Sequence, residues 1–344
     1  MAGFRNQFIH LIKWISPISS NRLLTLLTQQ KLILPVYHLV ADHQVPHIKN
    51  LYQIRDTKTF VSDLDFLLKN YDPIDLNTLS DCVHGKITLR KKSFLITFDD
   101  GLREFADIVA PILLKRGIPA VCFLNNNFID NQALFYRYKA SIIIEYLSKN
   151  IEPQALQGVY DLFPTEEPSR LNLIKNILAI TYLNRQRVDE IAKPLGIDFD
   201  QYLKDKRPYL TSDEIDSLLA QGFDFGAHSL DHPEYYLITI SEQLRQTTQS
   251  VDRLSTRFAL PHKVFAFPFT DYNVSTAFFR RLNEGYPNIG LTFGSAGLKQ
   301  DPVQNHLQRI PMEMGSLSAK QIINGELLYY LLKIPFRKNT VDRK

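Results

Sequence analysis

Cysteine, tryptophan and long apolar runs are all scarce in this chain of 344 residues, which has two cysteines and one tryptophan. The two cysteines, Cys82 and Cys122, are too few for a disulfide framework, and neither belongs to a Cys-x-x-Cys zinc motif. Cys122 lies in the apolar run at 120–124, so we interpret it as a core residue. No apolar run has the length of a membrane-spanning helix. The sequence therefore predicts neither a disulfide-stapled domain nor a membrane-spanning protein.

An excess of one charge sign is also missing, because 40 basic residues are balanced by 36 acidic ones and the formal net charge is +4. No long basic run alternates with aromatic residues, so we expect no nucleic-acid partner. The composition is globular, with 44% hydrophobic residues, 22 phenylalanines and 16 tyrosines. Such a chain can bury a sizeable core, in one large domain or in two ordinary ones.

The two ends of the chain differ from the middle. Apolar positions in the first 24 residues are interrupted by Arg5, His10 and Lys13, and a clean signal-peptide apolar region is missing. We predict an amphipathic helical segment over 1–30 that packs on the protein, with contact to a membrane surface as the alternative. Residues 319–344 are predicted to form a C-terminal helix and a basic tail. A cytoplasmic location follows by default.

Short apolar runs alternate with segments of helical spacing along most of the chain, a pattern typical of parallel α/β architecture. Strands are predicted at 32–40, 93–98, 120–124, 223–225, 264–267, 289–293 and 307–310. The alternation fails at about 131–207, where the pattern is mainly helical. We interpret this stretch as a helical insertion in one barrel-like domain over 31–318; the alternatives are a cap over the site and a separate domain.

Two pairs of polar residues follow predicted strands. Asp99 and Asp100 end one apolar run, and His228 and His232 lie four residues apart after another. Functional groups collect at the carboxyl ends of strands in parallel α/β folds, so we expect these segments to converge. Two imidazoles and one carboxylate suit a divalent metal, zinc above all, and the second carboxylate would remain as a base. This set of side chains indicates metal-assisted hydrolysis.

At these residues the chain resembles the polysaccharide deacetylases with the NodB homology fold, carbohydrate esterase family four. Thr97-Phe98-Asp99-Asp100-Gly101 is similar to the first motif of the family, and His228-Ser229-Leu230-Asp231-His232 is similar to the second. Tyr37-His38 resembles an element of the branch that deacetylates poly-N-acetylglucosamine. The resemblance spans roughly 34–312 apart from the insertion. It implies a distorted (β/α)7-type barrel and metal-dependent removal of N-acetyl or O-acetyl groups from a carbohydrate.

The resemblance also implies residue roles. Asp99 would be the general base, and His38 the general acid with His306 as its substitute. Asp100, His228 and His232 would bind the metal, which is expected to be zinc, with cobalt, nickel or iron as alternatives. The partner would be an acetylated carbohydrate.

The third motif departs from the family pattern. The sequence here is Ala266-Phe267-Pro268-Phe269, and the arginine that orients the base in the family is absent. Pro268 and Phe269 would still line the substrate, and Phe269 would present its backbone N–H to the developing oxyanion. Arg309 resembles a late element of the same branch and is predicted to support the site. The altered motif keeps two alternatives open: an inactive sugar-binding barrel, and an amidohydrolase acting on a non-sugar C–N bond.

Overall fold

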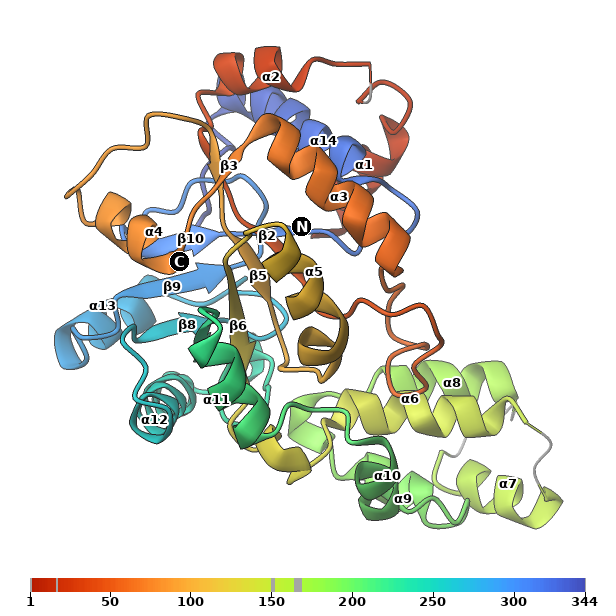
Figure 1. Ribbon diagram of the computed structural model, residues 1–344. Helices are drawn as coiled ribbons and strands as arrows, with labels where there is room; N and C mark the ends of the chain where they lie inside the picture. Colours follow the sequence, from red (N-terminus) through yellow and green to blue (C-terminus); the bar gives the residue numbers. More distant parts are fainter. Residues whose placement is uncertain (1, 17, 150–151, 164–168, 344) are drawn as a thin grey trace.

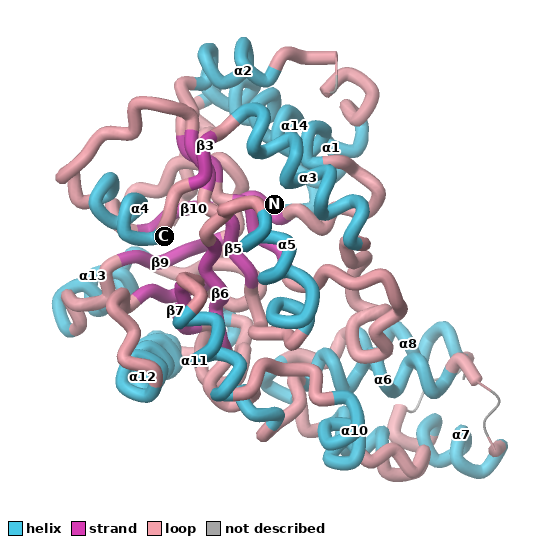
Figure 2. The backbone as a smooth tube through the Cα atoms, in the orientation of Figure 1, coloured by secondary structure: helices cyan, strands magenta, loops and turns pink. Residues whose placement is uncertain are grey.

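The computed structural model describes residues 2–16, 18–149, 152–163 and 169–343. Its centre is a sheet of eight parallel strands in the order β10-β9-β8-β7-β6-β5-β2-β11. The helices surround this sheet (Figures 1 and 2). The strands are β2 (Pro35–Tyr37), β5 (Ile96–Phe98), β6 (Ala120–Leu124), β7 (Asp224–Ala227), β8 (Val264–Ala266), β9 (Leu291–Gly294), β10 (His306–Gln308) and β11 (Ile310–Pro311).

The two edge strands of this sheet are halves of one chain segment, because only Arg309 separates β10 from β11. The amide of Arg309 donates to the carbonyl of Gly294 (3.2 Å), and the amide of Ile310 donates to the carbonyl of Leu34 (2.8 Å). The segment thus bonds to one edge of the sheet on each side and nearly closes it into a ring. This arrangement confirms the predicted distorted barrel of (β/α)7 type.

Two predicted strands are each divided between two sheets. A small parallel sheet in the order β1-β4-β3 lies beside the barrel and contains β1 (Leu32–Ile33), β3 (Asp72–Pro73) and β4 (Ser93–Phe94). The runs predicted at 32–40 and 93–98 begin in this sheet and continue in the barrel as β2 and β5. Leu34 and Leu95 lie at the two crossing points, and both are buried.

Amphipathic helices cover the barrel, and all of them except α5 begin with a polar N-cap, so their apolar faces become part of its core. They are α3 (Thr57–Asn70), α4 (Leu76–Val83), α5 (Ala110–Lys115), α11 (Ser212–Ala220), α12 (Ile240–Arg257) and α13 (Thr276–Gly285). Short helical turns also occur between these elements. They are η1 (Phe105–Val109, a π-helix leading into α5), η2 (Ile129–Asn131) and η4 (Tyr235–Leu237). The capping box of α11, in which Thr211 and Glu214 exchange hydrogen bonds, shows how the sequence sets such a start.

The stretch predicted as an insertion is helical and projects from the side of the barrel at the lower right of Figure 1. It consists of α6 (Tyr136–Leu147), α7 (Pro153–Tyr160), α8 (Arg170–Leu178), η3 (Tyr182–Asn184), α9 (Arg187–Ala192) and α10 (Phe199–Lys206). These helices share an apolar core with the segment that follows β2, which includes the buried Leu39 and Ile48. The insertion is therefore packed against the rim of the barrel.

Helices from both ends of the chain pack together. They are α1 (Ala2–Leu11), α2 (Asn21–Thr28), α14 (Ala319–Lys333) and the short η5 (Ile334–Phe336). Asn324 in α14 donates to the carbonyls of Ser16 and Ser19 and accepts from Asn21, all at 2.9–3.0 Å. Among the described residues, no helix is both long enough and apolar enough to cross a bilayer.

Candidate active site

The turn after β5 directs the two adjacent carboxylates to different partners. Asp100 and Gly101 both have positive φ, at 74° and 63°, so the chain bends sharply here. A Cβ at Gly101 would lie 2.6 Å from the Leu124 side chain, which leaves room only for glycine. Asp99 and Asp100 are both buried. The local backbone thus lets one carboxylate bind a cation while its neighbour contacts another group.

Asp100, His228 and His232 come together at the strand ends as the metal motif predicts. Their ligand atoms all lie within 4.8 Å of one another. Asp100 Oδ1 is 3.1 Å from His232 Nε2 and 3.6 Å from His228 Nε2. His232 has a φ of 61°, so it lies in a tight turn, as Asp100 does. Two imidazoles and one carboxylate facing one point form a donor set that suits zinc.

The contacts behind the cluster fit a metal. The Nδ1 of His228 lies 2.9 Å from the carbonyl of Ala266, which assigns the proton to Nδ1 and leaves Nε2 as the ligand atom. Tyr138 donates to Asp100 Oδ2 at 2.7 Å. Asp100 Oδ1 is buried, and among the described residues it has no hydrogen-bond partner. A buried carboxylate oxygen aimed at two imidazoles is the arrangement that a cation completes.

Charge in the cluster also suits a cation. Burial alone would raise the pKa of Asp100, but the adjacent His232, His38 and His228 hold it well below its usual range. Burial lowers the pKa of His228 to about 4, against the opposing effect of Asp99. At neutral pH the carboxylate is therefore ionised and this imidazole is neutral, as metal ligation requires.

Asp99 is paired with Arg309, the residue between β10 and β11. Two guanidinium nitrogens of Arg309 each donate to one carboxylate oxygen of Asp99 at 2.7 Å. Arg309 is 1% exposed, and its Nε donates to the carbonyl of Gly294. Burial raises the pKa of Asp99, but Arg309 and then His228 lower it further, so the pKa lies below its ordinary value. A distant strand thus supplies the arginine that the third motif lacks.

His38, which follows β2, is held by a carboxylate that sequence reasoning missed. Its Nδ1 lies 2.5 Å from Glu313 Oε2, and the amides of His38 and Leu39 donate to Glu313 Oε1 at 2.8 and 2.9 Å. Burial lowers the pKa of His38, but the Glu313 carboxylate outweighs burial and raises it to about 10. The imidazole is therefore protonated at neutral pH, and its ring orientation is fixed.

Aromatic rings form one wall of the cluster. Phe269 has φ of 55°, and its ring packs edge-on to the His232 ring with centroids 4.6 Å apart. The Phe135 ring, at the start of the insertion, lies 4.4 Å from the same imidazole and 5.9 Å from the Phe269 ring. None of the described residues accepts a hydrogen bond from the amide of Phe269. Pro268 precedes it in the turn and accepts from the Thr270 amide at 2.6 Å.

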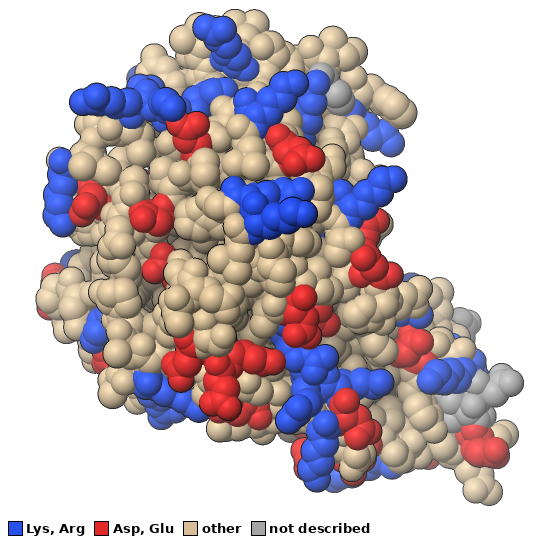
Figure 3. All heavy atoms as spheres, in the orientation of Figure 1, with Lys and Arg blue, Asp and Glu red and all other residues tan. Residues whose placement is uncertain are grey.

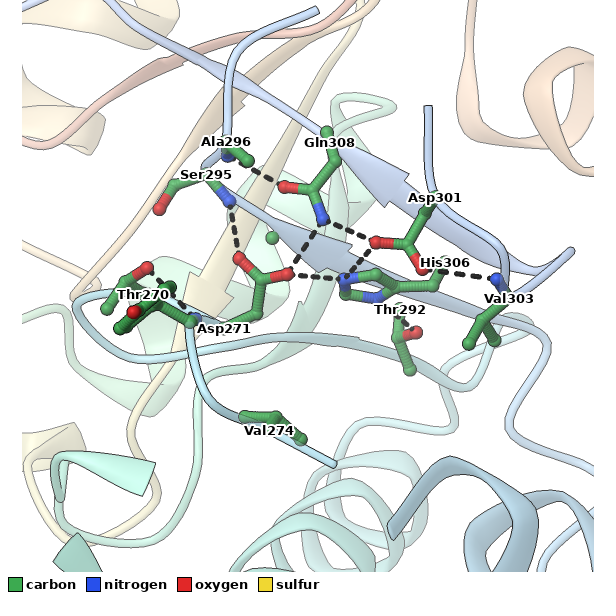
Figure 4. A network of polar contacts seen from close by, with 12 residues as sticks. Thr270, Asp271, Val274, Thr292, Ser295, Ala296, Asp301, Val303, His306 and Gln308 are labelled. Carbon is green, nitrogen blue, oxygen red and sulfur yellow. Dashed lines mark hydrogen bonds and ion pairs between the residues drawn. The ribbon is translucent and has the colours of Figure 1, made fainter. Parts of the chain in front are cut away.

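His306, the substitute acid, lies in a different polar cluster (Figure 4). Its Nδ1 contacts Thr292 Oγ1 at 2.8 Å and its Nε2 contacts Asp271 at 3.0 Å. A second group of metal-binding type consists of His306, Asp271 and Asp301, but Arg343 donates to both carboxylates. A guanidinium therefore already pairs with both carboxylates of this group, and the cluster fastens the C-terminal tail to the barrel. Both ring nitrogens of His306 are engaged.

A cavity of about 340 Å³ begins beside the cluster. Phe269 and Glu313 belong to its wall and contact His232 and His38 respectively. Its lining is mostly apolar and also includes Tyr272, Tyr329 and Lys299, together with Arg5 and Asn6 of α1 and Val341 of the tail. Tyr272 is 46% exposed. Both ends of the chain thus contribute to a hollow next to the site.

Sequence reasoning missed Tyr138, Phe135 and Glu313. Two of them belong to the aromatic stretch Phe135-Tyr136-Arg137-Tyr138, which follows β6 and opens the insertion. That stretch was a usable signal, since it comes soon after a barrel strand. Glu313 follows β11 by two residues, at a strand end where other site residues also lie.

Comparison with known proteins identifies the family. Residues 86–283 match the family described as polysaccharide deacetylase, which is more than half of the chain. The chain belongs to this family and is a deacetylase, a hydrolase whose substrate is an acetylated carbohydrate. The matched segment contains Asp99, Asp100, His228 and His232, whereas His38 and Arg309 lie outside it. No curated protein matches the chain in sequence.

Solved structures share the fold at low sequence identity. The Streptococcus pyogenes deacetylase PplD in complex with acetate is 14% identical, with a TM-score of 0.53 over 86% of this chain and 98% of that one. IcaB from Ammonifex degensii is 15% identical, with a TM-score of 0.52 over 87% and 97% of the two chains. A polysaccharide deacetylase from Bacillus cereus, BC0361, has 14% identity and a TM-score of 0.51 over 86% and 69%.

The buried Arg309–Asp99 pair predicts a large loss of stability in Arg309→Met. That change leaves the Asp99 carboxylate buried without its guanidinium, which costs about 3–5 kcal/mol for such pairs. Urea unfolding followed by circular dichroism measures the loss. The control is Arg245→Met, which breaks a bidentate but solvent-exposed ion pair with Glu242. This change should lower the free energy of unfolding by about 1 kcal/mol or less. Equal losses in the two variants would contradict the argument.

Proposed function

We propose that this protein is a metal-dependent deacetylase that hydrolyses an N-acetyl group on a polysaccharide, with O-acetyl groups as a second substrate. The observation that carries the proposal is the buried cluster of Asp100, His228 and His232 with Asp99 beside it. His228 Nε2 lies 3.6 Å from Asp100 Oδ1 and 3.9 Å from Asp99 Oδ2, so the ligand carboxylate and the base face one reaction centre.

Asp100, His228 and His232 would hold the cation. Zinc is the favoured ion because it accepts imidazole and carboxylate together, and cobalt, nickel or iron fit the same donors. Bound there, such an ion supplies Lewis acidity that polarises the acetyl carbonyl and acidifies water. Tyr138 fixes the carboxylate through Oδ2, and the Ala266 carbonyl fixes the imidazole of His228.

Asp99 serves as the general base and takes a proton from the attacking water. Arg309 keeps Asp99 ionised in its buried position and, by bonding both oxygens, fixes the plane of the carboxylate. The backbone amide of Phe269, which donates to none of the described residues, is available to the oxygen on which negative charge develops.

His38 serves as the general acid and gives a proton to the leaving nitrogen, which departs as an amine while the acetyl group leaves as acetate. Its Nδ1 is engaged by Glu313, so Nε2 is the nitrogen that delivers the proton. Because Glu313 raises the pKa of His38 to about 10, the acid is already protonated at neutral pH. Base and acid thus begin the cycle in opposite protonation states.

The cavity beside the site supports a polymeric substrate. Tyr272 and Phe269 expose 46% and 41% of their surface, and aromatic faces of this kind stack on the C–H face of a pyranose ring. Lys299 lines the same cavity, and among the described residues its ammonium has neither a hydrogen-bond nor an ion-pair partner. A sugar next to the acetylated one can fill this space.

Acetate release is the decisive measurement. The purified protein, with metal added back, is incubated with chitin oligomers and with a partly acetylated polysaccharide, and acetate is quantified. Release from glycans supports the proposal. Binding of glycans without release would instead favour an inactive sugar-binding barrel, an alternative that the altered third motif motivates. Turnover of simple amides without turnover of sugars would favour an amidohydrolase.

Loss of one imidazole should remove the metal. His228→Ala deletes one of three ligands, so we expect stoichiometric metal to disappear and acetate release to fall by at least about a hundredfold. Metal is measured by elemental analysis of the protein after dialysis. His84→Ala is the control, because this exposed imidazole lies outside the cluster and, among the described residues, its ring hydrogen-bonds only to the Ser80 carbonyl and hydroxyl. Full metal content in His228→Ala would contradict the assignment.

Removal of the Glu313 charge should shift the pH profile. A general acid works while it is protonated, so activity falls as the pH rises through the pKa of His38. In Glu313→Gln the largest raising influence on this pKa is lost, while burial still lowers it and only the weaker effects of Asp100 and Asp99 still raise it, so we expect the alkaline limb to move from near pH 10 towards the ordinary histidine value of about 6.5. The pH dependence of kcat/KM measures this limb, and an unchanged limb would exclude His38 as the acid.

Loss of the exposed tyrosine should reduce the preference for longer glycans. For the wild type we expect kcat/KM for acetate release to rise from monosaccharide to oligosaccharide. In Tyr272→Ala the ratio between the two should fall about tenfold, as expected for one lost aromatic stacking contact. Tyr286→Ala is the matched control, since Tyr286 is 39% exposed and follows α13 outside this cavity. An equal ratio in both variants would argue against the cavity as a sugar site.

A further inference from the structure

The N-terminal segment, which comprises α1, α2 and the turns between them, has both buried and exposed apolar residues. Ile9 and Leu24 are buried, and Ile9 contacts Gly325 of α14. Asn21 and Asn324 add a buried hydrogen bond between α2 and α14. These contacts account for the attachment of α1 and α2 to the barrel, and they leave the exposed apolar residues unexplained.

The exposed apolar residues of this segment are large side chains on α1, on α2 and in the turns between them. We call this set the N-terminal apolar surface, and its members are Leu11, Trp14, Ile15, Ile18, Leu26 and Leu27. Each of them is 56–87% exposed. Six such residues within 17 positions are unusual for a free protein surface, where exposed apolar residues are normally scattered. A surface of this kind indicates a partner.

The charged residues of the N-terminal segment itself have one sign. No acidic residue precedes Asp42 in the sequence. Arg5 is buried and paired with Glu326, so it does not contribute. Lys13, Arg22 and Lys31 are exposed, and none of them is paired with a carboxylate among the described residues. Figure 3 shows blue Lys and Arg side chains amid uncharged surface at the upper end of the molecule, where Figure 1 places α2.

We propose that the N-terminal apolar surface docks on a lipid bilayer that contains anionic lipids. The apolar side chains enter the boundary between headgroups and acyl chains, while Lys13, Arg22 and Lys31 contact lipid phosphates. The helices lie in the plane of the interface, which agrees with the finding that no described helix is fit to span a bilayer. An acidic protein partner fits less well, because exposed Leu, Ile and Trp side chains beside Lys and Arg are the composition of an interfacial helix face.

Docking would also orient the active site. Arg5 and Asn6, near the start of α1, line the cavity beside the catalytic cluster. Leu11, at the end of the same helix, belongs to the N-terminal apolar surface. The helical rise from Asn6 to Leu11 is about 8 Å. The cavity would therefore lie close to the lipid surface, within reach of a glycan held there.

The single tryptophan of the chain makes the test direct. Trp14 is 75% exposed and is the only indole, so its fluorescence reports on this surface without a label. The full-length protein is mixed with vesicles of phosphatidylcholine alone or with about 30% phosphatidylglycerol, which imitates an anionic leaflet. We expect a blue shift of Trp14 emission and co-sedimentation with the anionic vesicles, both weakened by high salt.

Matched double variants distinguish vesicle binding by this surface from nonspecific binding by any exposed apolar residue. Ile18→Ser/Leu26→Ser removes two exposed members and retains Trp14, and it should weaken vesicle binding at least about tenfold. Leu171→Ser/Leu183→Ser is the control, because these side chains are similarly exposed but lie on the helical insertion. Lys13→Glu/Arg22→Glu should abolish the preference for anionic lipid. Circular dichroism verifies that each variant is folded.

Several outcomes would overturn the proposal. These are absence of vesicle binding, binding without a change in Trp14 emission, and equal loss in the insertion control. A dimer in sedimentation velocity that Ile18→Ser/Leu26→Ser dissociates would assign the surface to a second copy of the chain instead. None of these measurements depends on turnover, so they stand apart from the test of deacetylase activity.

Discussion

The buried pair of Arg309 and Asp99 joins the architecture of this protein to its chemistry. Arg309 is the residue at which the last barrel strand passes from β9 to β2, and its backbone helps to close the ring. Its guanidinium bonds both oxygens of Asp99, the proposed base. Removing a carboxylate from water costs several kcal/mol unless a cation is nearby, so the barrel can bury Asp99 only because it closes at an arginine. The same contact keeps the carboxylate ionised.

In the rest of the proposed site, the barrel strands and the segments outside them have different parts. Strand ends supply the residues with chemistry, and other segments hold them in place. Tyr138 and Phe135 reach the metal cluster from the insertion, and Glu313 orients His38 from the loop after β11. The insertion thus has a part in the site even though most of it packs on its own core. These supporting contacts set ligand orientation and pKa, which the strand-end residues alone do not determine.

The ends of the chain complete the surroundings of the site. Arg343 in the tail pairs with both Asp271 and Asp301, so that a cluster resembling a second metal site attaches the tail to the barrel. The tail and α1 then form part of the cavity beside the catalytic cluster. If α1 and α2 dock on a bilayer, this cavity faces the lipid surface. Glycan access would then depend on segments outside the matched deacetylase region.

The sequence by itself determined the fold class, the family and the residues that meet in the cluster, because short motifs follow strands whose apolar character is local. The barrel and its family were predicted and are confirmed, and Asp100, His228 and His232 lie together. The pairing of Arg309 with Asp99, and the contacts of Glu313 and Tyr138, join positions 38–275 residues apart. Only the tertiary structure decided these, because side-chain contacts at such separations depend on strand order and barrel closure, which no local pattern records.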